Sequence, residues 1–108
     1  MKFITYKGGM VREDSSDKIN YLLVRDGPML ERWARHLTKG AKKYSARNWM
    51  KACDLEALER GKESAARHFE QWLKGMQDED HAAAVFFNIN LVEYILENLE
   101  GRQLCFKL

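Results

Sequence analysis

Three side chains with possible catalytic or ligand chemistry occur close together near position 80. His81 and Asn88 are seven residues apart, which places them on one stripe of a helix, the stripe that faces inward. Because burying an unpartnered polar group costs roughly a few kcal/mol, each is either hydrogen-bonded in the core or used in a site. Asp78 precedes His81 by three residues, a spacing at which a carboxylate and an imidazole can share a divalent cation. The alternative is that Asp78 and Asp80 only cap the helix that follows.

A preceding segment, residues 54–74, carries further polar candidates. Arg67 can hold a phosphate through two parallel hydrogen bonds, which lysine does less well. His68 flanks the apolar stripe of the same segment and can act as a general base or a metal ligand. The glutamates, Glu59 among them, face away from that stripe, and a solvated helix surface is the simplest interpretation of them.

The segment 39–49 combines cations with aromatic rings. Lys43 and Tyr44 are adjacent, and Asn48 and Trp49 follow shortly after. Such a group suits a nucleotide, whose phosphates would bind the basic side chains and whose base would stack on a ring. Its composition equally allows a basic surface loop in which Trp49 fills the core. The chain has no P-loop, no G-x-G-x-x-G and no H-E-x-x-H pattern, which excludes several common enzyme classes as leading candidates.

Helices must position these side chains. Apolar spacing predicts them over about 26–40, 54–74 and 78–100, with a glycine at or just beyond each end. We therefore expect one mainly α domain over 1–108: a compact three-helix bundle at 26–101, an irregular strand and loop arm at 1–25 and a tail at 102–108. The tail can form a strand that pairs with an N-terminal strand at 1–6, and an extended piece is expected at 21–24.

The second predicted helix has a stripe of apolar residues that should face the core. The stripe includes Leu58, Phe69 and Trp72, which recur at helical spacing. Gly61 interrupts the helix and is expected to cost about 1 kcal/mol relative to alanine.

The totals describe a small folded protein with no strong charge bias. The 108 residues suffice for one domain, and the rich aromatic content of 11% leads us to expect that some rings lie at a subunit interface of a homo-oligomer. The net charge is only +2, with both signs mixed along the chain, which argues against a duplex nucleic acid as partner. No apolar run is long enough for a signal peptide or a membrane span, so we expect no membrane partner and a cytoplasmic location.

The segment GAKKYSARNW at 40–49 resembles the "GA-x-KYG-x-x-NW" signature of the dATP/dGTP diphosphohydrolase N-terminal domain, a family common in phages. Further pieces follow in the family's order: GGMVRE at 8–13, LERWARHLTKG at 30–40, ARHFEQWLKG at 66–75 and DEDHAAAVFFN at 78–88. The resemblance covers about residues 8–98. The chain departs from the family at Ser45, where glycine is usual, and at Asp17–Asn20, which keeps only part of a "G-K-x-R" motif.

The resemblance implies a phage protein of the host cytoplasm that binds or hydrolyses purine deoxynucleoside triphosphates. The chain is also distantly similar to the all-α MazG-type pyrophosphohydrolases, whose magnesium motifs, E-x-x-E and E-x-x-D, would fall on Glu56/Glu59 and Asp78/His81. Together these likenesses imply Mg²⁺ held by Asp78, His81 and Glu59, with His68, Asp78 and His81 as the catalytic residues. The residues implied to bind substrate are Lys43, Tyr44, Asn48, Trp49, Arg67 and Asn88.

Two non-catalytic alternatives stay open at this point. The chain can be a nucleotide binder that sequesters a host signal or regulates a partner, which needs the basic and aromatic groups but no complete metal site. It can also be an interaction module whose polar residues only stabilise the fold.

Overall fold

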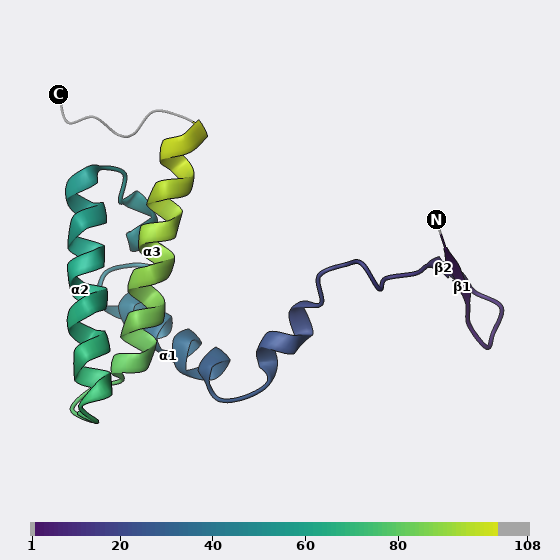
Figure 1. Cartoon of the computed structure of the whole chain (residues 1–108), viewed down its shortest axis with the longest axis horizontal. Coiled ribbons are helices and arrows are strands. Elements are labelled where there is room, and N and C mark those ends of the chain that lie inside the picture. The colour runs from purple at the N-terminus through teal and green to yellow at the C-terminus, as the bar shows by residue number, and fades with distance from the viewer. Residues whose placement is uncertain (1, 102–108) are drawn as a thin grey trace.

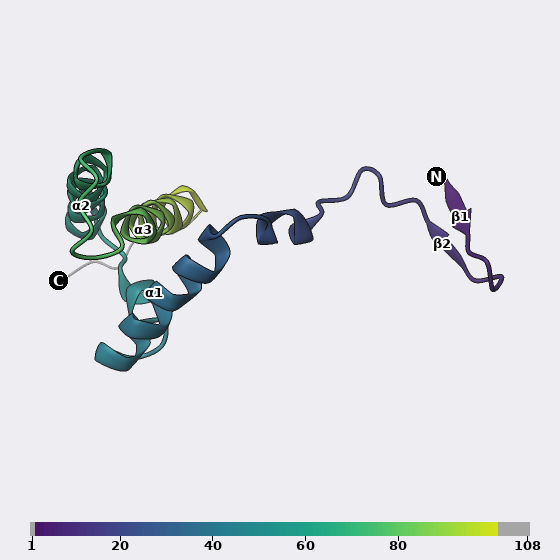
Figure 2. The same cartoon turned by 90° about the horizontal axis from the view of Figure 1, so that it is seen from below.

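A long helix, α3 (His81–Gly101), organises the computed structural model, which describes residues 2–101, the side chains of residues 100 and 101 excepted. The helix α2 (Leu55–Leu73) lies antiparallel beside α3, and α1 (Met29–Lys43) packs across the first half of α3 (Figures 1 and 2). Two short 3-10 helices, η1 (Tyr21–Arg25) and η2 (Asn48–Lys51), flank α1 in the chain. The mainly α fold class is therefore confirmed.

Local capping signals set the ends of α2 and α3 where the sequence predicts them. The Asp54 carboxylate accepts a hydrogen bond of 2.9 Å from the Ala57 backbone N–H at the start of α2. Gly75 ends that helix with a φ of 76°, a left-handed conformation that glycine adopts without a steric penalty. The Asp80 carboxylate accepts a hydrogen bond of 3.0 Å from the Ala83 N–H at the start of α3. Each cap satisfies a backbone donor that the helix itself leaves unpaired.

The core lies between α2 and α3, where Leu58, Val92 and Ile95 form the buried apolar cluster. Gly61 is buried beside this cluster, and a Cβ placed on it would lie only 2.8 Å from Cγ2 of Val92. The residue that the sequence marks as a weak point therefore lies where α2 and α3 are in close contact. Its missing side chain is a packing requirement.

The predicted inward stripe of α2 is wrong for most of its length. Leu58 is buried, whereas Phe69, Trp72 and Leu73 are 45%, 50% and 57% exposed. The helix is rotated so that its small residue Gly61 and, two turns later, His68 face α3. A helix face with a glycine permits a closer approach than one with bulky rings, and this leaves the large apolar side chains of α2 at the surface.

The N-terminal arm extends away from the helices (Figure 1). Its strands β1 (Phe3–Thr5) and β2 (Val11–Glu13) form an antiparallel hairpin with Ile4 opposite Arg12. The radius of gyration of 19.0 Å exceeds the roughly 13 Å of a compact chain of this length, so the arm adds to the dimensions without joining the core. In the described part of the chain the partner of β1 is β2; the tail at 102–108 lies outside the described residues.

Two local expectations near α1 are wrong. Residues 21–25 form η1 instead of an extended piece, because the Asn20 side chain accepts a hydrogen bond of 3.0 Å from the Leu22 N–H and starts a helical turn. The helix α1 also runs through Gly40 to Lys43. A backbone hydrogen bond of 2.9 Å from the Tyr44 N–H to the Gly40 carbonyl continues the helix, and lysines in its last turn suit the helix dipole. No helix in residues 2–101 has the length and apolarity needed to cross a bilayer.

Candidate functional site

Two histidines and an aspartate form a hydrogen-bonded chain where α2 meets α3. Nδ1 of His68 lies 2.9 Å from Nδ1 of His81, and Nε2 of His81 lies 2.7 Å from Oδ1 of Asp78. The side chain of His81 is only 1% exposed, whereas that of Asp78 is 61% exposed. The chain of contacts therefore runs from the surface carboxylate through a buried imidazole to a partly buried one.

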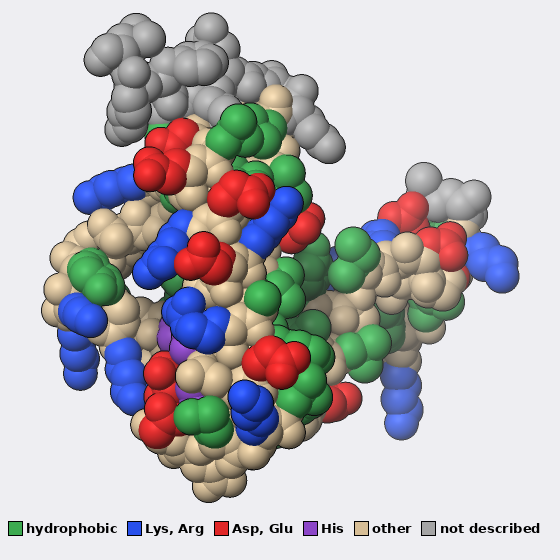
Figure 3. Space-filling model, turned by 60° about the vertical axis from the view of Figure 1, so that its left-hand side comes forward, with side chains coloured by type: hydrophobic (Ala, Val, Ile, Leu, Met, Phe, Trp, Pro, Cys, Tyr) green, Lys and Arg blue, Asp and Glu red, His purple; other side chains and the backbone are tan. Residues whose placement is uncertain are grey.

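Glu79 lies at the same place. One ligand atom from each of Glu79, His68 and His81 can be chosen so that all three lie within 4.8 Å of one another. We call these three residues the histidine cluster. The cluster comes from a short piece of the fold, the last turns of α2, the connecting loop and the first residue of α3. Figure 3 shows histidine side chains reaching the surface only narrowly, among acidic and basic side chains.

The second imidazole of the cluster has a perturbed acidity. Partial burial lowers the pKa of His68 below its usual value, and the positive charge of Arg67 lowers it further, whereas Glu79 opposes the shift. Neutral imidazole is the form that accepts a proton or binds a metal. The environment thus favours the form of His68 that can do chemistry near neutral pH.

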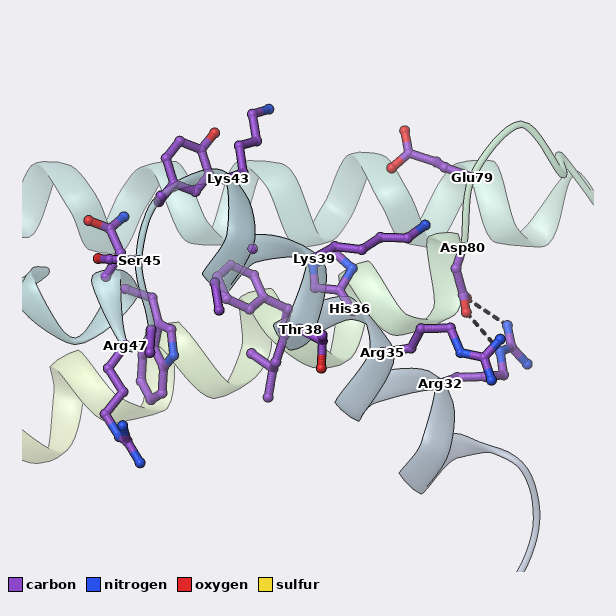
Figure 4. A pocket seen from close by; sticks show the side chains of 18 residues that line it. Arg32, Arg35, His36, Thr38, Lys39, Lys43, Ser45, Arg47, Glu79 and Asp80 are labelled. Atoms are coloured by element: carbon purple, nitrogen blue, oxygen red, sulfur yellow. Dashed lines mark hydrogen bonds and ion pairs between the residues drawn. The ribbon is translucent and has the colours of Figure 1, made fainter.

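A pocket of about 710 Å³ opens beside the histidine cluster, bounded by the second half of α1, the segment 44–49 and the start of α3 (Figure 4). Glu79 lines this pocket and also belongs to the histidine cluster, so the two features adjoin. The pocket lining contains both cationic and aromatic side chains: Arg35, Lys39, Lys43 and Arg47, with Tyr44, Trp49 and Phe87.

The free positive charge of the pocket comes from its lysines and one arginine. Arg35 is paired with Glu31. For Lys39, Lys43 and Arg47 no ion pair is found among residues 2–99, whose side chains the structure describes. Arg47 stands at a φ of 61°, a left-handed conformation that is uncommon for a residue with a side chain and that turns the chain sharply before η2. The pocket therefore offers three unneutralised cations to an anionic ligand.

An ion pair anchors α1 to the start of α3 at the edge of the pocket. Arg32 donates two hydrogen bonds to the Asp80 carboxylate, of 2.9 Å from Nε and 2.7 Å from the terminal nitrogen (Figure 4). These bonds lower the pKa of Asp80 to about 2 and raise that of Arg32. His36, one turn after Arg32, packs against Phe87 with ring centroids 5.2 Å apart, and burial lowers its pKa although Asp80 and Glu79 oppose that shift.

Four of the substrate residues implied by the sequence line the pocket: Lys43, Tyr44, Asn48 and Trp49. Nζ of Lys43 lies 5.2 Å from the centroid of the Tyr44 ring, and Tyr44 is 65% exposed. The Trp49 ring packs edge-on against Tyr94 of α3 at 5.2 Å, so it both supports the core and faces the pocket. The sequence allows Trp49 either to stack on a nucleotide base or to fill the core, and its position is compatible with both.

The other implied residues are placed differently. Arg67 is exposed, and its terminal nitrogen lies 3.5 Å from the Ser64 hydroxyl. Asn88 is buried and donates a hydrogen bond of 2.9 Å to the Ala84 carbonyl of its own helix. Glu59 is exposed and lies 3.5 Å from the Lys62 ammonium. None of Arg67, Asn88 and Glu59 lines the pocket or joins the histidine cluster, although the expected inward position of His81 and Asn88 is confirmed.

The sequence did not indicate Arg32, His36 and Glu79 as residues of this region. It indicated Asp80 only as a helix cap and not as the ion-pair partner of Arg32. Arg32, His36 and Lys39 recur at helical spacing on α1, a polar stripe that was available as a signal of a functional face. The pairing of Arg32 with Asp80 spans 48 residues, and no local pattern indicates it.

A comparison with known protein families matches residues 9–102 to the model described as "dATP/dGTP diphosphohydrolase, N-terminal". Comparisons with curated proteins and with solved structures gave no match.

Proposed function

The chain belongs to the dATP/dGTP diphosphohydrolase N-terminal family, and on that basis we propose that it binds purine deoxynucleoside triphosphates in the pocket beside Glu79 and splits them into the monophosphate and pyrophosphate. The observation that carries this proposal is the pocket's lining, where unneutralised cations and aromatic rings surround a space of about 710 Å³. That volume is within the range of small-molecule sites, about 300–1,000 Å³.

The triphosphate would lie along the cationic side of the pocket. Lys39, Lys43 and Arg47 would bind phosphate oxygens through charge-assisted hydrogen bonds. The base would stack on Tyr44, the exposed ring of the lining. Glu79 would then face the reacting phosphate, because it lines the same pocket on the side of the histidine cluster.

The reaction would be attack of water on the α-phosphorus. A new oxygen–phosphorus bond forms, the bond to the bridging oxygen of the β-phosphate breaks, and pyrophosphate leaves with those electrons. His68 would take the proton of the attacking water, since its surroundings favour the neutral imidazole. Asp78 and His81 would hold His68 in position through the hydrogen-bonded chain. Arg67 and Asn88 belong neither to the pocket lining nor to the histidine cluster, so we propose no contact with the reacting phosphate for them.

Magnesium fits the triphosphate better than it fits the histidine cluster. Mg²⁺ prefers six oxygen ligands, whereas the cluster offers two imidazole nitrogens and one carboxylate. Of the magnesium ligands implied by the sequence, Glu59 is exposed beside Lys62 and Asp78 is bonded to His81. We propose that Mg²⁺ accompanies the nucleotide through its phosphate oxygens, and we assign no protein ligand set to it.

The alternative is a nucleotide binder without turnover, and one observation favours it. The basic and aromatic lining of the pocket is complete without any contribution from His68 or His81. A chain that lost its chemistry would therefore keep its affinity. The binder needs Lys43 and Tyr44, whereas the enzyme also needs the histidine cluster.

One experiment separates the two functions. The full chain is incubated with each of the four deoxynucleoside triphosphates and Mg²⁺, with chromatographic detection of the monophosphate and calorimetric measurement of binding. We expect turnover of the purine substrates, lost in His68→Gln with affinity unchanged within a few-fold. Binding without product in the unmodified chain would select the binder, and neither binding nor product would contradict both.

Lys43 and Lys42 provide a matched pair for the pocket itself. They are neighbours at the end of α1 and both are exposed, but only Lys43 lines the pocket. We expect Lys43→Gln to weaken nucleotide binding about tenfold or more, since a hydrogen bond to a charged group contributes roughly 1.5–3 kcal/mol. Lys42→Gln should have little effect. Equal losses in the two variants would mean that only the overall charge attracts the nucleotide.

We also propose that the chain acts as a homo-oligomer through the exposed face of α2. Phe69 and Trp72 are in ring contact at 5.6 Å, and both are about half exposed. A self-complementary apolar helix face suits a twofold dimer, in which each copy covers the other's rings. Light scattering on the purified chain should give the dimer mass, and Trp72→Glu should give the monomer mass. Glu63→Ala, on the exposed surface of the same helix, is the control and should keep the dimer mass. A monomeric unmodified chain would contradict the proposal.

A further inference from the structure

The two imidazoles of the histidine cluster meet nitrogen to nitrogen. Nδ1 of His68 and Nδ1 of His81 are 2.9 Å apart, so one of them must donate a proton to the lone pair of the other. The contact of 2.7 Å between Nε2 of His81 and Oδ1 of Asp78 assigns the roles. A carboxylate can only accept, so Nε2 of His81 carries a proton, and in the neutral imidazole Nδ1 of His81 then presents its lone pair toward His68.

Little movement would convert this contact into a metal site. Two nitrogens that each lie about 2.0–2.1 Å from a tetrahedral ion are about 3.3–3.4 Å apart. Moving the His68 proton to its other nitrogen and opening the gap by about 0.4–0.5 Å, from the present 2.9 Å, would aim both lone pairs at one ion. Side chains at the end of a helix and the start of the next can accommodate such a shift without moving the core.

Glu79 supplies the third ligand. One oxygen of its carboxylate lies within 4.8 Å of one ring nitrogen of each histidine, and the side chain is exposed, so it is free to approach a bound ion. Three protein ligands with one open position are the arrangement of catalytic zinc sites. The open position would face the pocket, because Glu79 lines the pocket as well.

Asp78 has the orienting role in this arrangement. It holds the distal nitrogen of His81, and a carboxylate in that position fixes the tautomer and the ring orientation of a metal-binding histidine. We propose that His68, His81 and Glu79 bind a divalent transition-metal ion of the zinc class, with Asp78 as the positioning residue of His81. Two nitrogens and one oxygen suit Zn²⁺, Co²⁺ or Ni²⁺ and disfavour Mg²⁺ and Ca²⁺. The part of this ion in turnover rests on the proposed function, whereas its binding does not. With the ion bound, neither nitrogen of His68 has a free lone pair, so the role of His68 as the base belongs to the ion-free chain.

The test measures the metal alone, in the absence of nucleotide. Chelator-treated, tag-free full chain is titrated with Zn²⁺ by calorimetry and with Co²⁺ by visible absorption, which reports a tetrahedral site. We expect one equivalent per chain, a loss of at least about a hundredfold in affinity for His68→Gln, and a clear loss for Glu79→Gln. Asp78→Asn should cost about 10–100-fold, the usual effect of removing such a partner.

Glu59→Gln is the matched control, because Glu59 is an exposed glutamate of α2 outside the histidine cluster, and it should leave the affinity unchanged. Glu79 is exposed too, so Glu79→Gln should leave the fold intact, and circular dichroism of the variant checks this. Zn²⁺ binding that Glu79→Gln and His68→Gln leave intact, or no Zn²⁺ binding at all, would overturn the site. Nucleotide binding is measured separately, with Mg²⁺ and without any transition metal, which keeps this result distinct from a failure of the nucleotide proposal.

Discussion

Replacing Gly61 by alanine tests the packing that brings the two histidines together. A Cβ at this position would lie 2.8 Å from Cγ2 of Val92, closer than real carbon atoms approach. Val92 is 92% buried, as its 8% exposure shows, and a valine in a helix has one strongly preferred rotamer, so its methyl group cannot turn aside. Over-packing of this kind costs about 1–3 kcal/mol, while alanine gains about 1 kcal/mol in helix propensity. We expect a net destabilisation of about 0–2 kcal/mol.

Gly40→Ala is the matched control, because Gly40 is also helical but a Cβ there would meet nothing within 4 Å. It should stabilise the chain by about 0.5–1 kcal/mol, so the two variants should differ by about 1–3 kcal/mol. Urea unfolding followed by circular dichroism, at one protein concentration, measures both. Adding Val92→Ala to Gly61→Ala should remove the clash and show a favourable coupling. Equal stabilisation by the two alanines would refute the close approach of α2 and α3.

Two further predictions concern the pocket and its edge. Asp80→Asn keeps a side chain that can cap α3 but removes the ion pair with Arg32. The shift in the pKa of Asp80 from 3.8 to about 2 would correspond to about 2.5 kcal/mol in the free energy of unfolding. Because the Asp80 side chain is 35% exposed, we expect the variant to lose about 1 kcal/mol. Since the folded pKa is the lower one, this stability is complete above about pH 5 and is lost as the pH falls toward 2. Urea unfolding at several pH values should show a smaller acid loss in the variant than in the unmodified chain, because the lowered pKa of Asp78 contributes to the loss in both. Nucleotide binding should change the fluorescence of Trp49, which lines the pocket, and Trp49→Phe should abolish the change although Trp33 and Trp72 remain. A signal that persists in this variant would place the nucleotide outside the pocket.

The sequence predicts well what is decided within a few residues. Asp54 and Asp80 lie at the helix starts and Gly75 at a helix end, and each acts through backbone groups at most a few positions away. The contact between Asp78 and His81 is of the same kind, because three residues span less than one turn. The contact of His68 with His81 spans 13 residues; both were candidates from the sequence, but their contact depends on how α2 is rotated.

That rotation could not be predicted from apolar spacing alone. A stripe of large apolar residues indicates a face that avoids water, but it does not say whether the neighbour is another helix of the chain or a second copy. In α2 the bulky face stays exposed and Gly61 faces α3. The same rotation turns Glu59 to the surface and His68 toward α3. Because Glu59 points away from α3, the acidic residue of the histidine cluster is Glu79 of the loop.

Asp80 connects the two halves of the candidate site. Its carboxylate caps α3 through the Ala83 N–H and at the same time binds Arg32 of α1. The pocket needs α1, whereas the histidine cluster needs only α2, the loop and the start of α3. Glu79 directly precedes Asp80 in the chain. It is the residue that the pocket and the histidine cluster share. Breaking the ion pair of Asp80 with Arg32 should therefore shift Glu79 relative to the pocket, while nucleotide and metal can each still bind, since neither proposed set of ligands includes Asp80.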